Sequence, residues 1–356
     1  MKKTILLFLF LLPIAFITAQ ELTYTQASDL NIIGRIGPAP HPYHRADTAL
    51  YPELNREENK LVRYASGMAV VFTTNSPVIG VRTKYLYRYP GRSSTQIALA
   101  GYDLYIRRDG QWLYAASEVE PIDGKTLVLV NNMEASMKEC LLYLPLFSEI
   151  GSLEIGVAPG SALSASENPF RHKIVFFGSS FTHGTSASRP GMSYPMQIER
   201  NTGLYIKNLG VSGHSELQPV FADMLAASGA DAFVFDAFSN TTSGQIETRL
   251  IPFITRIRQS CPRTPMIFVQ TIYRENNNFD LSKRAGFAER RATAERMMAI
   301  AMEQFKDVYF INIPNLTGDD HVSSTDGIHP SDLGYYRWAN NLQPRLLEIL
   351  AKYGIK

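Results

Sequence analysis

The sequence predicts two domains: an all-β sandwich or jelly roll, followed by an α/β domain with a doubly wound, five-stranded parallel sheet. Three observations predict this. The chain has 356 residues, which fits two domains better than one. Short β-rich runs without a convincing amphipathic helix fill residues 20–166, and strands alternate with helices over residues 171–356. The polar, turn-rich stretch GSALSASENPFRH contains the junction.

Residues 1–19 are predicted to be a secretory signal peptide. Lys2 and Lys3 precede the apolar run ILLFLFLLPIAFI, which is too short to span a bilayer comfortably, and the small Ala19 marks a cleavage position. A single N-terminal membrane anchor is the alternative. We therefore expect a secreted or periplasmic bacterial protein with no stable membrane span after cleavage.

The composition is that of a globular protein, with 45% hydrophobic and 19% charged residues. Lys and Arg total 35 against 33 Asp and Glu, so no nucleic-acid partner is expected. The two cysteines, Cys140 and Cys261, lack metal-type spacing. They are interpreted as buried thiols, and a disulfide between them is the alternative, which the sequence cannot decide. No metal or cofactor is predicted.

The first half is predicted to contain a series of short strands. An Asp-Gly pair at 109–110, flanked by alternating residues, predicts a hairpin. The expected strand regions are 68–89 (two runs broken by Asn-Ser-Pro), 101–119, 125–132, 139–147 and 153–160.

The second half is predicted to alternate strand and helix. Ser193 is a candidate N-cap, Gly203 a candidate helix stop, Pro219 fits a first turn, and Pro252 predicts a kink or break. Strands are expected at 173–178, 204–210, 230–238, 264–272 and 307–313, and helices at 192–203, 216–228, 244–260, 282–305 and 331–353. Five such units imply a parallel sheet with helices on both faces, and ligands at the carboxyl ends of its strands.

Polar motifs follow four of the five predicted strands. GSSFTHG follows the first, NLGVSGHS the second, DAFSNTT the third and DGIHPSDLG the fifth. Acyl transfer needs a hydroxyl nucleophile, a base, a group that orients the base, and donors for the oxyanion. A serine of the first motif, the Asp326–His329 pair, Gly213 and Asn240 supply these groups.

Each of these signals has a structural alternative. Gly-Ser-Ser and Asp-Gly can be ordinary turns, a histidine beside a proline can be structural, and Asn240 begins a glycosylation sequon or a cap. Gly213 can simply provide a positive φ. The order of all four motifs at successive strand ends favours the catalytic interpretation.

This order resembles the SGNH (GDSL-type) hydrolases, an esterase and lipase superfamily with a flavodoxin-like α/β fold. The resemblance places the nucleophile at Ser180, with Ser179 where the family's usual aspartate stands. It implies a triad of Ser180, His329 and Asp326. The backbone N–H groups of Ser180 and Gly213 and the side chain of Asn240 would form the oxyanion hole.

A narrower resemblance comes from GYDLY at 101–105 and GTSASRPGMSYP at 184–195. The first is similar to the Gly-x-Asp-Leu-Tyr signature of a β domain that precedes some bacterial SGNH esterases. From the residues alone, Asp103 in an apolar strand is interpreted as a structural hydrogen-bonding group.

The resemblance implies a secreted esterase that removes small acyl groups, such as acetyl, from small molecules or polysaccharides. Four side chains are candidates to line the substrate site: His183, His214, Arg189 and Tyr194. An acyltransferase using the same site and a non-catalytic glycan-binding protein are the alternatives. A nucleotide site is disfavoured, because GSSFTHG lacks both P-loop and dinucleotide-binding spacing.

Overall fold

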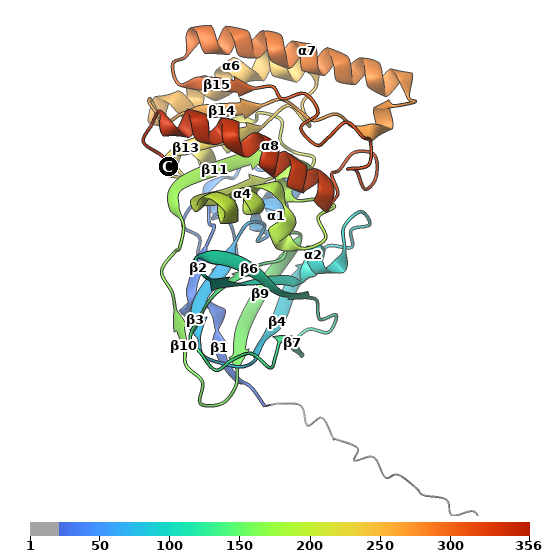
Figure 1. The fold of residues 1–356 in the computed structure, drawn as a ribbon. Coiled ribbons are helices and arrows are strands. Elements are labelled where there is room, and N and C mark those ends of the chain that lie inside the picture. Colours follow the sequence, from blue (N-terminus) through green and yellow to red (C-terminus); the bar gives the residue numbers. More distant parts are fainter. Residues whose placement is uncertain (1–20) are drawn as a thin grey trace, which may run out of the picture.

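The computed structural model describes residues 21–356, so the predicted signal peptide lies outside the described residues. Strands β1 to β10 occupy the lower half of Figure 1, and β11 to β15 with helices α3 to α8 occupy the upper half. A search of the described residues for a helix long and apolar enough to cross a membrane finds none.

The first half contains two antiparallel sheets. One has the order β1-β9-β4-β7 and the other β10-β3-β8-β5-β6, with β2 paired to β3. The strands are β1 (Thr23–Gln26), β2 (Asn31–Ile33), β3 (Ala69–Thr74), β4 (Ile79–Arg88), β5 (Tyr102–Arg108), β6 (Gln111–Glu118), β7 (Thr126–Val130), β8 (Lys138–Tyr143), β9 (Ser148–Val157) and β10 (Leu163–Ala165). The predicted series of short strands is confirmed, and these strands pair in antiparallel sheets.

The hairpin predicted at the Asp-Gly pair joins β5 to β6. Arg108 pairs with Gln111, so the loop has two residues. Asp109 and Gly110 have φ of 52° and 78°, as a type I′ turn requires.

The prediction that this half contains no helix was wrong. Helix α1 (Arg56–Arg63) begins at a capping box formed by Asn55 and Glu58, and a short α2 (Gln96–Ala100) is capped by Thr95. The polar composition of α1 concealed it, because only Leu61 and Val62 supply a buried apolar face. The Asn-x-x-Glu cap was the available signal.

The second half contains the predicted five-stranded parallel sheet, in the order β12-β11-β13-β14-β15. Its strands are β11 (Arg171–Gly178), β12 (Leu204–Gly210), β13 (Ala232–Asp236), β14 (Met266–Val269) and β15 (Val308–Ile311). Its helices are α3 (Ser180–His183), α4 (Tyr194–Thr202), α5 (Pro219–Ala226), α6 (Ser243–Ser260), α7 (Leu281–Gln304) and α8 (Asp332–Ala351). Helix α8 packs against α4, and α6 packs against α7 (Figure 1). Helix α6 also packs against α5.

The predicted helix boundaries differ in how well they hold. Gly203 ends α4 in the left-handed region, and Pro219 is the first residue of α5. Ser193 is the N-cap residue of α4, but its side chain makes no capping hydrogen bond. Helix α6 continues through Pro252, so no break occurs there.

The second β sheet lies between two apolar cores. Along β8, Cys140 and Leu142 pack into the core shared with the first sheet, while Leu141 and Tyr143 pack into the core that continues into the parallel sheet. This alternation follows the two-residue period of a strand. The β half therefore packs against the α/β half through a continuous apolar core. Cys140 and Cys261 are both free thiols, and burial raises the pKa of Cys140 to about 12.

Buried polar contacts also join the halves. Arg45 is fully buried and donates to the carbonyls of Asn208 (2.8 Å) and Gly210 (3.0 Å) on β12, and to that of Leu61 (2.5 Å). Because β12 is an edge strand, these alternate carbonyls have no neighbouring strand to bond. Arg45 thus satisfies the open edge of the parallel sheet from the β half.

Candidate active site

Ser180 occupies the turn between β11, the first strand of the parallel sheet along the chain, and the short helix α3. Strand β11 ends at Gly178, Ser179 caps α3, and Ser180 is its first residue. A Cβ on Gly178 would lie 2.1 Å from Thr182 Oγ1, so the tight turn requires glycine. At the first helical position, the N–H of Ser180 has no intrahelical acceptor.

Ser180, His329 and Asp326 form a hydrogen-bonded chain. Ser180 Oγ lies 3.0 Å from His329 Nε2, and His329 Nδ1 lies 2.7 Å from Asp326 Oδ2. Asp326 Oδ1 also accepts from the backbone N–H groups of Ile328 (3.0 Å) and His329 (2.8 Å). Burial opposes ionisation of Asp326, but the hydrogen bonds from His329 hold its pKa below the usual value. The carboxylate is therefore charged and orients the imidazole.

Aromatic packing brings this histidine across the sheet. His329 precedes α8 in the loop after β15, which is separated from β11 by two strands. Phe181 packs edge-on against both His329 (5.8 Å between ring centroids) and Trp338 of α8 (5.7 Å). Tyr194 of α4 stacks on Trp338 at 4.4 Å. The docking of α8 on α4 thus places the histidine beside Ser180.

Gly213 and Asn240 lie on the two sides of this turn. They follow β12 and β13, which are the two neighbours of β11 in the sheet. Gly213 is exposed with φ of 77°, and a Cβ there would meet nothing within 4 Å. Asn240 Oδ1 accepts from Ser215 N at 3.3 Å, while Nδ2 donates to no other described residue. Both positions therefore retain hydrogen-bond donors that a ligand could use.

The carboxylate of Asp236, which sequence reasoning missed, anchors the turn that carries Ser180. Asp236 ends β13, and its Oδ2 accepts from Ser179 Oγ (2.5 Å) and Ser179 N (3.1 Å). Its Oδ1 accepts from the hydroxyl of Ser239, the residue before Asn240. Burial raises the pKa of Asp236. A carboxylate from a neighbouring strand therefore supports the turn in which Ser179 replaces the family's usual aspartate.

Arg274, which follows β14, is a second residue that sequence reasoning missed. Its guanidinium lies 5.6 Å from the Phe181 ring centroid and donates to the carbonyl of Ser239. Arg290 donates to the same carbonyl at 3.3 Å. The two arginines thus fix the segment that leads to Asn240. The rule that ligand groups gather at strand ends would have singled out Arg274.

The four candidate substrate-lining residues have different surroundings. His183 is fully buried and stacks on Phe147 at 4.0 Å, and Tyr194 is 2% exposed with its hydroxyl 2.9 Å from Thr182 Oγ1. Neither side chain reaches an accessible surface, so we do not retain them as lining residues. His214 is half-buried beside Gly213, and Arg189 binds Asp103. Among residues 21–356, no cluster of three or more metal-ligating side chains occurs.

Comparisons with known families identify both halves. Residues 171–347 match the GDSL-like lipase/acylhydrolase family, and residues 22–163 match the family described as the N-terminus of SGNH-hydrolase-type esterases. The chain is 39% identical to a protein from Bacteroides ovatus described as a GDSL-like lipase, with a TM-score of 0.90. That match covers 93% of this chain and 98% of the other. No curated protein matches.

The chain therefore belongs to the GDSL-like lipase/acylhydrolase family, which confirms the predicted resemblance, and it is a carboxylic ester hydrolase. More distant structures share the fold. A salicylyl-acyltransferase from a tetracycline biosynthetic pathway has a TM-score of 0.72 at 20% identity, covering 94% of this chain and 99% of that one. A family two carbohydrate esterase from Clostridium thermocellum has a TM-score of 0.56 at 16% identity, covering 80% and 93%.

Proposed function

We propose that the protein is a secreted serine esterase that hydrolyses small acyl esters, such as acetyl esters, on carbohydrates. The observation that carries the proposal is the hydrogen-bonded chain from Ser180 Oγ through His329 to Asp326, with distances of 3.0 and 2.7 Å. Nucleophile, base and orienting carboxylate stand in the order that acyl transfer needs.

In the proposed first step, Ser180 Oγ attacks the ester carbonyl carbon and its proton passes to His329 Nε2. The tetrahedral intermediate collapses when the bond to the alcohol oxygen breaks, and His329 returns the proton to that oxygen. A water molecule then attacks the acyl-Ser180 ester and passes a proton to His329. The bond to Ser180 Oγ breaks, the acid leaves, and His329 returns the proton to Ser180 Oγ. Asp326 remains ionised and stabilises the imidazolium.

The proposed oxyanion hole consists of the N–H groups of Ser180 and Gly213 and Nδ2 of Asn240. Support comes from their common edge, their free donors, and the bond from Ser215 N to Asn240 Oδ1, which leaves the amide N–H₂ of Asn240 to donate. These donors are fixed before substrate arrives, as electrostatic stabilisation of a transition state requires.

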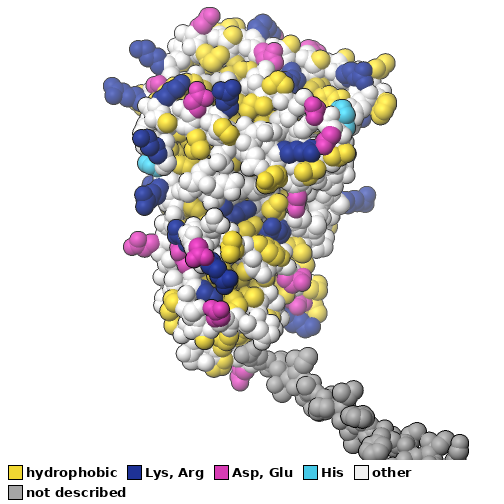
Figure 2. Space-filling model, viewed as in Figure 1, with side chains coloured by type: hydrophobic (Ala, Val, Ile, Leu, Met, Phe, Trp, Pro, Cys, Tyr) yellow, Lys and Arg dark blue, Asp and Glu magenta, His cyan; other side chains and the backbone are white. Residues whose placement is uncertain are grey.

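A carbohydrate ester is the proposed substrate class. The Clostridium thermocellum esterase with this fold was solved in complex with cellohexaose, a glucan oligomer. His214 remains a candidate lining residue, since its loop carries Gly213. On the face seen in Figure 2, basic and acidic side chains are interspersed, which suits a neutral polysaccharide better than a polyanion.

Acyl transfer to a sugar or other alcohol is the second candidate function. The salicylyl-acyltransferase of the same fold favours it, because the proposed acyl-enzyme can react with any alcohol that excludes water. Product analysis with an added sugar acceptor distinguishes transfer from hydrolysis.

We also infer the finer organisation. The shared core between the antiparallel sheets supports a sandwich domain at residues 20–166, and the two groups of helices support a doubly wound, flavodoxin-like domain at residues 171–356. Cleavage of the predicted signal peptide would release the protein to the periplasm or the medium. N-terminal sequencing of the mature protein tests that inference, and a start at Met1 would contradict it.

The direct test compares p-nitrophenyl acetate hydrolysis by wild type, Ser180→Ala and Ser179→Ala. We expect Ser180→Ala to abolish turnover and Ser179→Ala to retain some. Loss of all activity only in Ser179→Ala would show that the nucleophile is Ser179 and not Ser180. A folded wild type without activity would favour glycan binding without turnover, the third interpretation.

A further inference from the structure

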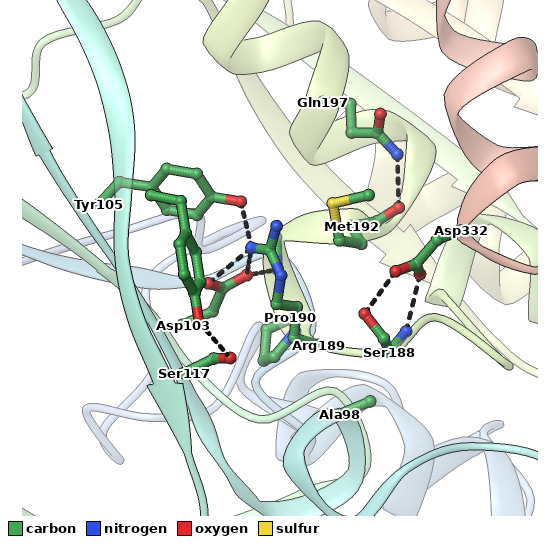
Figure 3. Close-up of polar contacts among 12 residues, drawn as sticks. Ala98, Asp103, Tyr105, Ser117, Ser188, Arg189, Pro190, Met192, Gln197 and Asp332 are labelled. Atoms are coloured by element: carbon green, nitrogen blue, oxygen red, sulfur yellow. Dashed lines mark hydrogen bonds and ion pairs between the residues drawn. The ribbon is translucent and has the colours of Figure 1, made fainter. Parts of the chain in front are cut away.

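A chain of polar contacts leads from the β domain to the loop that carries His329. It begins at Asp103, the aspartate of the GYDLY motif on β5, whose side chain is fully buried. Arg189 Nη1 donates to both oxygens of this carboxylate, at 2.8 and 2.7 Å, and to the hydroxyl of Tyr105 at 2.5 Å (Figure 3). The Asp103 carboxylate also accepts from Gly191 N at 2.9 Å.

The segment that Asp103 holds has little freedom to move. A Cβ on Gly191 would lie 2.7 Å from Asp103 Oδ2 and 2.9 Å from Arg200 Nη1, so the backbone approaches the carboxylate as closely as glycine permits. Arg200 Nη2 donates to the carbonyl of Gly191 at 2.7 Å. The β domain adds Ser94 Oγ, which accepts from Ser186 N at 2.9 Å. Residues 186–191 are thus clamped to the β domain.

The same segment forms hydrogen bonds with the first turn of α8. Ser188 N donates to Asp332 Oδ1 at 2.8 Å, and Ser188 Oγ donates to Asp332 Oδ2 at 2.5 Å (Figure 3). Asp332 is the first residue of α8 and lies three residues after His329. Nearby, Tyr335 of α8 donates from its hydroxyl to the carbonyl of Thr185 at 2.6 Å.

The clamped segment follows the turn that carries Ser180 closely, because α3 ends at His183 and only Gly184 and Thr185 stand before residue 186. The segment therefore connects both sides of the proposed catalytic pair. One end continues from Ser180, and Ser188 holds the helix that follows His329. Neither Asp103 nor Arg189 contacts Ser180, His329 or Asp326 through a side-chain hydrogen bond.

The geometry points to Asp103 as a positioning residue: through Arg189 and the Ser188–Asp332 contact, the β domain holds His329 at hydrogen-bond distance from Ser180. This inference rests on the proposed function and deepens it. The guanidinium of Arg189 is engaged by Asp103 and Tyr105, so we assign it to this chain of contacts rather than to substrate binding.

The test uses the full-length protein with Asp103→Asn, Asp332→Asn and the double variant. Glu139→Gln is the matched control, since it replaces a carboxylate on the same β sheet whose ion pair with Arg107 (3.3 Å) is more exposed. We expect each single variant to lower kcat for p-nitrophenyl acetate about tenfold with KM within about twofold, since small misplacement of reacting groups slows chemistry. The double variant should be no slower than the worse single, and the control should match wild type.

A measurement that does not depend on turnover separates this inference from the proposed function. The proton on His329 Nδ1, bonded to Asp326, should give a low-field NMR resonance in wild type that broadens or disappears in Asp103→Asn. If wild type lacks esterase activity but Asp103→Asn alters this resonance, the proposed function fails and the positioning inference stands.

Ser188→Ala keeps the test valid if Asp103→Asn does not fold, because it removes only one hydroxyl. We expect its kcat to fall about threefold and its low-field resonance to broaden. Unchanged kcat and an unchanged resonance in folded Ser188→Ala and Asp103→Asn would overturn the inference. Additive effects in the double variant would also contradict it, because independent effects do not pass through one chain of contacts.

Discussion

The carboxyl edge of the parallel sheet and the interface between the two halves both carry many polar groups. The two regions differ in whether these groups have hydrogen-bond partners within the protein. At the edge, Asn240 Nδ2 and the N–H of Gly213 donate to no described side chain. At the interface, Arg45 and Asp103 are fully buried and bonded within the protein. Open donors are available to a substrate, whereas buried side chains that bond across the interface fix one arrangement of the two halves.

This difference follows from the energetics of burial. A buried polar group without a partner costs about 1–3 kcal/mol, so each interface contact penalises any other docking orientation. Substitutions at the interface should therefore change stability or positioning, and substitutions at the edge should change the chemical step alone.

Replacement of Arg45 by methionine should produce the largest change in stability. The variant leaves the carbonyls of Asn208, Gly210 and Leu61 without their donor, so we expect the free energy of unfolding to fall by about 3 kcal/mol or more. Urea denaturation measures it, with the exposed Arg345→Met as control. A loss no larger than that of the control would show that the edge of β12 does not need Arg45.

Replacement of Asn240 by alanine should reduce turnover without this loss of stability. Removing one oxyanion donor typically lowers kcat about 10²–10³-fold, and the half-buried side chain gives up only the 3.3 Å hydrogen bond from Ser215 N. Steady-state kinetics and a melting temperature measured together test the pair of expectations. An unchanged kcat would remove Asn240 from the oxyanion hole.

Exchanging the residues at positions 179 and 236 tests whether the turn that carries Ser180 needs one carboxylate at either position. Ser179→Asp alone places a second carboxylate against Asp236, and Asp236→Ser alone removes the acceptor for Ser179 N, so each should lower kcat about tenfold or more. The double variant restores one carboxylate to the turn and should exceed both singles in kcat. A double variant with a lower kcat than either single variant would show that a carboxylate at position 179 cannot replace the one at position 236.

The smallest effect is expected from Glu199→Gln at the interface. Glu199 accepts from the hydroxyl of Tyr143 and from Ile206 N, both at 2.9 Å, and burial raises its pKa to about 8. Between pH 4.5, the pKa in the unfolded chain, and pH of about 8, the folded state binds one more proton than the unfolded state. The contribution of Glu199 to the free energy of unfolding therefore falls as the pH rises through this range.

Glu199→Gln should therefore lose less stability than wild type between pH 5 and pH 8. Melting temperatures at both pH values for the two proteins measure the difference. Parallel pH profiles would show that Glu199 titrates normally.

Most elements of the α/β half could be predicted because its strands are mainly apolar and most of its longer helices begin or end at recognisable residues. Strand β12 was predicted at its observed bounds, and Gly203 ends α4 as expected. Helix α1 was missed because only two of its eight residues, Leu61 and Val62, are buried and apolar.

Parts of the candidate site could be predicted because they recur as short motifs. Asp326 and His329 are three residues apart, and their hydrogen bond is local. Asp236 supports Ser179 from 57 residues away, and Arg189 reaches Asp103 across 86 residues. Such pairs depend on how strands and domains are placed, which no local pattern contains. The same limit applied to His183, whose position near the nucleophile did not reveal that it faces the β domain.

The proposed mechanism requires a covalent acyl intermediate on Ser180. The most direct measurement is mass spectrometry of peptides from enzyme quenched with acid during p-nitrophenyl acetate turnover. We expect one acetyl group on Ser180 in wild type and none on this peptide in Ser180→Ala. An acetyl group on Ser179, or rapid turnover with no acylated serine at any time point, would contradict it.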